Sequence, residues 1–155
     1  PARKSVKKTL LFILISRFFT DLSNKMFTFP QETNTAHVRL ITSRQDLRAV
    51  TVCFRSFTEL RKEHPLFSLS LRSEANGFLI YKMDTPGLFH VWVRNKQTSI
   101  EEQDYKLNRW TSICGTWDAE SGLGQLWVDG KPSSRKYIIS GSNINEPMII
   151  VLGQV

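Results

Sequence analysis

Residues 110–130, WTSICGTWDAESGLGQLWVDG, contain the pattern that decides the fold. Over the first eight positions, every second side chain would lie on one face of an extended strand, with Ile113 and Trp117 on one face and Cys114 on the other. Ser121-Gly122 is a turn sequence, and Asp129-Gly130 is typical of a tight hairpin because both residues tolerate positive φ. The stretch therefore predicts consecutive antiparallel strands whose aromatic side chains pack in a core.

The same period-two pattern recurs on both sides of this unit, with turn residues between the runs, as in an antiparallel β-sandwich. Outside the first 25 residues, only residues 43–49 could form a helical turn. No internal repeat or linker divides the chain. The expected strands are 26–29, 36–40, 50–57, 66–71, 77–81, 88–93, 110–117, 124–128, 137–140 and 149–152.

The composition fits one such domain. The chain has 155 residues, of which 41% are hydrophobic, and its 10 Phe and 4 Trp residues can fill a core. No apolar run approaches the roughly 20 residues that a membrane-spanning helix needs, which excludes an integral membrane span.

The positive charge is concentrated at the N-terminus. The formal net charge is +7, and the first 25 residues contain six of the 21 Lys and Arg residues but only one of the 14 acidic residues. A nucleic-acid-binding domain would instead gather its positive charge on one folded face. The charge distribution therefore argues against a nucleic-acid partner.

Residues 1–20 are interpreted as a leader. A basic stretch, 1–8, precedes an apolar segment, 10–15, which is the order found in secretory signals. Cleavage is expected between Ser16 and Leu22. The alternative is an amphipathic or core helix, because an apolar segment of this length also suits a buried helix. We thus expect a signal-like helix over 1–20 and one domain over 21–155.

The two cysteines, Cys53 and Cys114, each lie in a strand-like run, and their wide separation does not match a metal-binding spacing. In a secreted protein, this arrangement favours a disulfide. Two buried free thiols in an intracellular protein are the alternative.

The sequence contains no known catalytic constellation. It has no His-Glu-x-x-His, Gly-x-Ser-x-Gly or phosphate-binding motif, and its acidic stretch 101–104 falls in a predicted loop. Carboxylates do not cluster as calcium requires, although the turn 74–77 could supply one or two oxygens. From these residues alone, the chain is a secreted β-sandwich that binds an unknown ligand and is not an enzyme.

From about Asp21 onward, the chain resembles the pentraxins. The family signature His-x-Cys-x-Ser/Thr-Trp-x-Ser/Thr matches at Cys114, Thr116 and Trp117 but not at Ser112 or Ala119. The other matching stretches are 24–30 (NKMFTFP), 50–53 (VTVC), 57–60 (FTEL), 78–81 (FLIY), 126–132 (LWVDGKP) and 150–154 (IVLGQ).

The resemblance implies a lectin-like jelly-roll sandwich, a Cys53–Cys114 disulfide and secretion. It also implies cyclic homo-oligomers, usually pentamers, and calcium-dependent recognition of phosphocholine or of other phosphate- or carbohydrate-bearing ligands. The resemblance therefore also implies a role in innate immunity and in the acute-phase response. Phosphocholine-binding members have an aromatic residue at the position of Tyr81, which could line a ligand pocket.

Two departures concern calcium. The family's first calcium loop contains an Asp-Asn pair, and here only Asn76 remains, preceded by Ala75. The family also continues after Leu-Gly-Gln into a loop with further acidic ligands, whereas this sequence reaches Val155, so we expect a truncated domain. We therefore expect Asn76 to contribute to an incomplete calcium site that binds calcium weakly or not at all. The alternative is a metal-independent adhesion or assembly module similar to laminin G-like domains.

Overall fold

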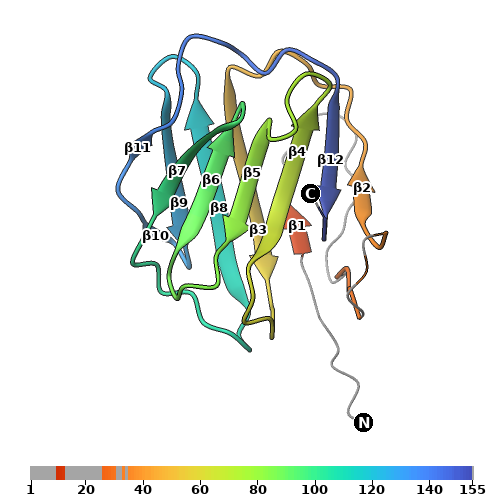
Figure 1. Cartoon of the computed structure of the whole chain (residues 1–155), viewed down its shortest axis with the longest axis vertical. Coiled ribbons are helices and arrows are strands. Elements are labelled where there is room, and N and C mark those ends of the chain that lie inside the picture. The colour runs from red at the N-terminus through yellow and green to blue at the C-terminus, as the bar shows by residue number, and fades with distance from the viewer. Residues whose placement is uncertain (1–9, 13–25, 31–32, 34, 155) are drawn as a thin grey trace.

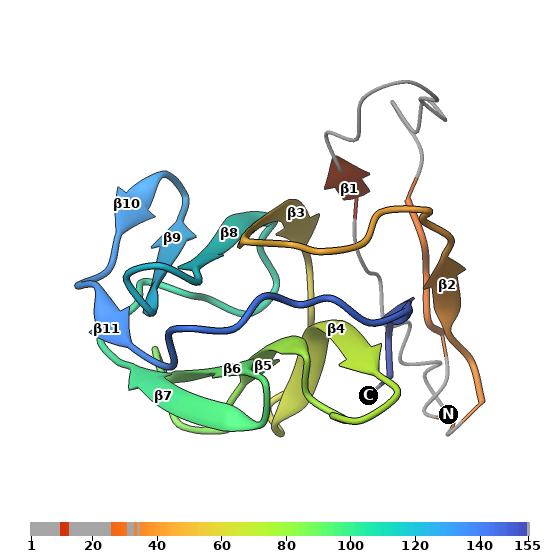
Figure 2. The same ribbon diagram turned by 90° about the horizontal axis from the view of Figure 1, so that it is seen from above.

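Two antiparallel sheets pack face to face in the computed structural model, which describes residues 10–12, 26–30, 33 and 35–154 (Figures 1 and 2). Sheet 1 has the order β1-β3-β8-β9-β10, with β11 also pairing with β9, and sheet 2 has the order β2-β12-β4-β5-β6-β7. The described residues contain no helix, which confirms the all-β jelly-roll sandwich. The strands are β1 (Leu10–Phe12), β2 (Val38–Leu40), β3 (Ala49–Ser56), β4 (His64–Leu71), β5 (Phe78–Lys82), β6 (Phe89–Val93), β7 (Lys96–Ile100), β8 (Thr111–Asp118), β9 (Leu123–Val128), β10 (Lys131–Pro132), β11 (Lys136–Tyr137) and β12 (Met148–Leu152).

The inward face of sheet 1 is the one that contains Ile113 and Trp117. Strand β8 alternates strictly between buried and half-buried residues, as the period-two pattern predicted. Trp117 is 1% exposed, and its indole Nε1 donates a hydrogen bond to the carbonyl oxygen of Ile139 at 2.9 Å. The core between the sheets is therefore organised around this strand, which occupies the middle of sheet 1 (Figure 1).

Gly115 on sheet 1 faces Ile80 on sheet 2 at close range. A Cβ atom at residue 115 would lie 2.6 Å from Ile80 Cδ1, and Ile80 is fully buried. A side chain at residue 115 would meet the tip of Ile80 on the opposite sheet, so it would fit only if Ile80 moved.

Gly115→Ala is expected to destabilise the fold by about 1–3 kcal/mol through overpacking, measured as a lower urea midpoint. Ile80→Val removes the Cδ1 atom that the new methyl group would meet. The double variant should therefore be more stable than the sum of the single losses predicts. Simple additivity would contradict the steric explanation.

Several local predictions were wrong. Residues 26–29 form no strand, since only Thr28 makes a single bridge, and residues 43–49 form no helical turn because Leu47 pairs with Ile144. The expected strand 137–140 is limited to the short pairing of β11 with β9. Strand β7 was missed because its sequence, KQTSI, is mostly polar.

The leader was predicted to be helical, but its described residues, Leu10–Phe12, form strand β1, which pairs with β3. Without β1, strand β3 would be the edge of sheet 1 and would have unpaired backbone N–H and C=O groups. An extended segment can pair with these groups, whereas a helix cannot. The rest of the 1–20 segment lies outside the described residues. In the described part of the chain, no helix has the length and apolar character needed to span a membrane.

Candidate functional site

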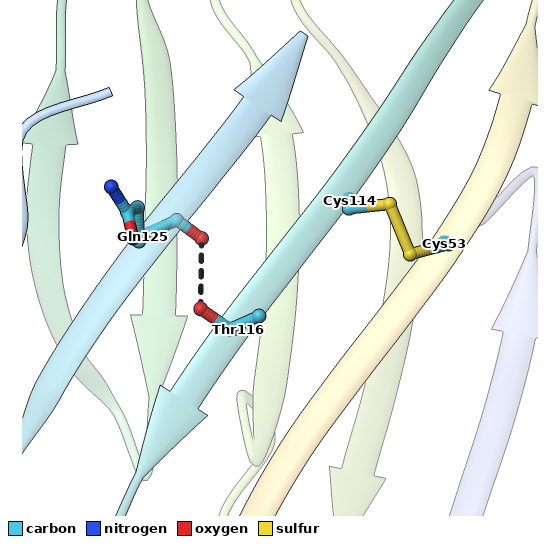
Figure 3. The surroundings of a disulfide bond; sticks show 4 residues. All are labelled: Cys53, Cys114, Thr116 and Gln125. Atoms are coloured by element: carbon cyan, nitrogen blue, oxygen red, sulfur yellow. Dashed lines mark hydrogen bonds between the residues drawn. A yellow bond between two sulfur atoms is a disulfide. The ribbon is translucent and has the colours of Figure 1, made fainter. Parts of the chain in front are cut away.

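The Cys53–Cys114 disulfide joins directly opposite residues of β3 and β8 (Figure 3). Their Cα atoms are 4.1 Å apart, and both residues are half-buried. Because Val52 and Phe54, the neighbours of Cys53, point into the core, the disulfide lies on the outer face of sheet 1. It links two strands within one sheet and takes no part in the candidate site on sheet 2.

Tyr81 lies on the outer face of sheet 2, where three aromatic side chains gather. It pairs with His90 on β6, and on the next rung of the ladder Leu79 pairs with Trp92. Tyr81, His90 and Trp92 are half-buried, whereas Leu79 is only 4% exposed. We call Leu79, Tyr81, His90 and Trp92 the aromatic face.

The aromatic face can bind a ligand with both apolar and polar character. Half-buried aromatic rings offer a flat apolar surface to solvent, and they also attract quaternary ammonium groups. Burial raises the pKa of Tyr81, and the Glu63 carboxylate adds to this effect while Lys62 opposes it. The Tyr81 hydroxyl is therefore protonated at neutral pH and can donate a hydrogen bond.

Asn76 lies in the loop 72–77, which connects β4 to β5 at the opposite end of β5 from Tyr81. The five-residue separation corresponds to roughly 16 Å along an extended chain. The backbone N–H of Asn76 donates to Asn95 Oδ1 at 3.0 Å, and the backbone N–H of Asn95 donates to the Asn76 carbonyl at 3.0 Å. The loop is thereby attached to the turn between β6 and β7, at the opposite end of β5 from Tyr81.

The carboxylate nearest in sequence to Asn76 is bound by an arginine. Arg94 Nε donates to both carboxylate oxygens of Glu74, at 3.1 Å and 3.0 Å, and Arg94 Nη2 donates to Oε1 at 2.9 Å. Both oxygens of Glu74 are thus engaged by a guanidinium group.

The residues around Asn76 do not fit calcium. Calcium requires six to eight oxygen ligands, usually with several carboxylates among them. The described residues contain no group of three or more His, Cys, Asp or Glu side chains that could hold a metal ion. The loop offers Asn76 and a Glu74 carboxylate that is already paired.

A buried ammonium group lies beneath the other end of β5. Lys82 is 6% exposed, and its Nζ donates to the carbonyl oxygens of Met83 and Thr85, the latter at 3.0 Å. The rings of Phe89 and Tyr105 lie 5.8 Å and 6.0 Å from this Nζ. Burial lowers the pKa of Lys82, and Asp84 partly opposes that effect. These contacts satisfy the ammonium group within the core.

The neighbouring Tyr105 gives a pH-dependent prediction. Burial raises its pKa above 10.0, partly opposed by the hydrogen bond with Ser56. Since the pKa is higher in the folded state, the buried phenol contributes stability that is complete below the unfolded pKa and is lost as pH rises through the folded pKa. In an alkaline titration followed by tyrosinate absorbance, Tyr105→Phe should remove a phase that lies above the ordinary tyrosine range. Wild-type and variant titrations with the same phases above that range would contradict this assignment.

Two residues of this region were missed by sequence reasoning, for different reasons. Trp92 could have been found, because it alternates with the core residues Val91 and Val93. Arg94 could not have been found in this way, because its partner Glu74 lies 20 positions earlier and no local pattern links the two residues.

Comparisons with known proteins agree with the fold. The profile of the Pentaxin family matches residues 25–155. The serum amyloid P-component of Mus musculus is 35% identical over 144 residues, which cover 91% of this chain and 63% of that protein. The chain thus spans less than two thirds of the length of this relative.

Two solved structures show the same fold. A native heptameric SAP-like pentraxin from Limulus polyphemus has a TM-score of 0.70 at 22% identity, covering 80% of this chain and 60% of that one. Domains LG4-5 of the mouse laminin alpha1 chain have a TM-score of 0.58 at 15% identity, covering 78% of this chain and 32% of that one.

Proposed function

The chain belongs to the Pentaxin family, and on that premise we propose that it is an extracellular, non-catalytic recognition protein that binds phosphocholine or other phosphate- or carbohydrate-bearing ligands. The observation that carries this proposal is the aromatic face, where Tyr81, His90 and Trp92 are half-buried on adjacent strands. A secreted location is supported by the disulfide and by the signal-like composition of residues 1–20.

The proposed recognition does not use calcium at Asn76. The family relationship favours calcium as a cofactor. In this loop, however, Ala75 stands where the family has an aspartate, and Glu74 is paired with Arg94, so too few oxygen ligands remain. The ligand is therefore proposed to contact the aromatic face directly.

An array tests the proposed function. The protein is applied to phosphocholine and to matched phosphorylated and unphosphorylated glycans, once with calcium and once with EDTA. We expect selective binding that persists in EDTA. Binding only to phosphorylated probes would identify phosphate as the recognised group, whereas absence of binding to every probe would contradict the proposal.

The alternative function is a metal-independent adhesion or assembly module. The Arg94–Glu74 ion pair is compatible with it, because a guanidinium group already neutralises that carboxylate. The array distinguishes the two functions, because an adhesion module would bind none of the small ligands.

We further propose assembly into a cyclic homo-oligomer, with a pentamer as the expected form. The heptameric state of the Limulus relative supports ring assembly. Native mass spectrometry of the secreted protein should show one closed oligomer, and a monomer at all concentrations would contradict this.

A further inference from the structure

We infer that the guanidinium group of Arg94 takes the place of a metal cation in the loop 72–77, so that this loop keeps its conformation without calcium. This inference deepens the proposed function. It rests on the proposed function for one consequence only, namely that the conformation of the loop next to the aromatic face does not depend on calcium. The ion pair and the conformation of the loop can be tested without any ligand.

Arg94 and Glu74 form a closely matched ion pair. The three hydrogen bonds between Arg94 and Glu74 engage both carboxylate oxygens, and the two side chains are 25% and 17% exposed. Bidentate charge-assisted hydrogen bonds of this kind are among the stronger ones in proteins, and partial burial reduces screening by salt. A calcium ion bound at Glu74 would lie beside the positive charge of Arg94 and would be repelled by it.

The backbone places Arg94 against the loop. The two strands β6 and β7 are joined by Arg94 and Asn95, which both have positive φ values, 47° and 60°. Two residues with positive φ form the tight turn that suits a hairpin. This turn and the loop 72–77 lie at the same end of sheet 2 (Figure 1), and the Arg94 N–H donates to the Gly77 carbonyl at 3.1 Å. The backbone thus holds Arg94 next to the loop independently of its ion pair with Glu74.

A second carboxylate, that of Glu146, lies beside the loop. Glu146 accepts hydrogen bonds from the Ser73 N–H, at 2.9 Å, and from the Ser73 hydroxyl group. The hydrogen bonds from Ser73 lower the pKa of Glu146, and the charges of Arg94 and Arg72 lower it further. The two carboxylates, Glu74 and Glu146, therefore lie near two arginines, whose positive charges oppose the binding of a divalent cation there.

Hydrogen exchange of the loop tests the inference without any ligand. Amide exchange of residues 72–77 is measured by mass spectrometry on the intact chain, in EDTA and in excess calcium. We expect the same protection in both conditions. Arg94→Gln should lower that protection roughly tenfold or more, in line with the loss of a charged hydrogen-bond pair. Lys96→Gln, which removes an exposed positive charge from the adjacent strand, should leave the protection unchanged.

A charge exchange keeps the test decisive if Arg94→Gln does not fold. Glu74→Arg combined with Arg94→Glu restores opposite charges and should recover most of the protection that either single change removes. Protection that rises when calcium is added to the wild type would overturn the inference, and so would unchanged protection in folded Arg94→Gln. Because no ligand is present, failure here is independent of failure on the array.

Discussion

Trp117→Ala is expected to destabilise the protein by about 3–5 kcal/mol, which is the usual cost of removing a large aromatic side chain from a core. Trp117 is 1% exposed in the middle strand of sheet 1. Its loss would leave a cavity between the sheets and would also leave the Ile139 carbonyl without its indole donor. Since single domains are stable by only about 5–15 kcal/mol, we expect a large fall in the urea midpoint.

Two variants separate the contributions at this position. Trp117→Phe retains most of the apolar volume and should recover part of the loss, leaving the missing hydrogen bond. Trp127→Ala removes the same type of residue from the outer face, where Trp127 is half-buried opposite Cys114. Equal destabilisation by Trp127→Ala and Trp117→Ala would contradict the assignment of the inner face.

The second large effect is expected from removal of the disulfide. Cys53 and Cys114 are 61 positions apart, and closing a loop of that length restricts the unfolded chain by about 4 kcal/mol on the entropy model. The double variant Cys53→Ser, Cys114→Ser should lose stability of this order. It should still fold to the same structure, because eight residue pairs connect β3 and β8.

Denaturant unfolding with and without reductant checks this prediction. The wild type should unfold at a lower midpoint in reductant, whereas the double variant should not respond to it. A wild-type midpoint that reductant does not change would show that the disulfide contributes nothing to stability.

The sandwich could be predicted from the sequence because its signals are local. The alternation around Ile113 and Trp117 and the Asp129-Gly130 turn act over a few residues, and both are present in the structure. The disulfide was favoured for a related reason, since each cysteine lies in a run that reads as a strand.

Long-range and edge features were not predictable in the same way. Strand β7 has a polar sequence, and its pairing depends on a turn in which Arg94, an unusual residue for positive φ, occupies the first position. The contact between Glu74 and Arg94 depends on how two hairpins meet, which neither segment encodes alone. The loop around Asn76 could therefore be recognised as a departure from the family, but its ion pair could not be foreseen.

The central claim is that the outer face of sheet 2 binds the ligand directly. The most direct measurement compares, in EDTA, the affinity of three proteins for the strongest probe on the array: the wild type, Trp92→Ala and Trp127→Ala. We predict that Trp92→Ala weakens binding roughly tenfold or more, as for a central aromatic contact, while Trp127→Ala, on the opposite sheet, binds like the wild type. Equal affinities of Trp92→Ala and the wild type, or binding that disappears in EDTA, would contradict the claim.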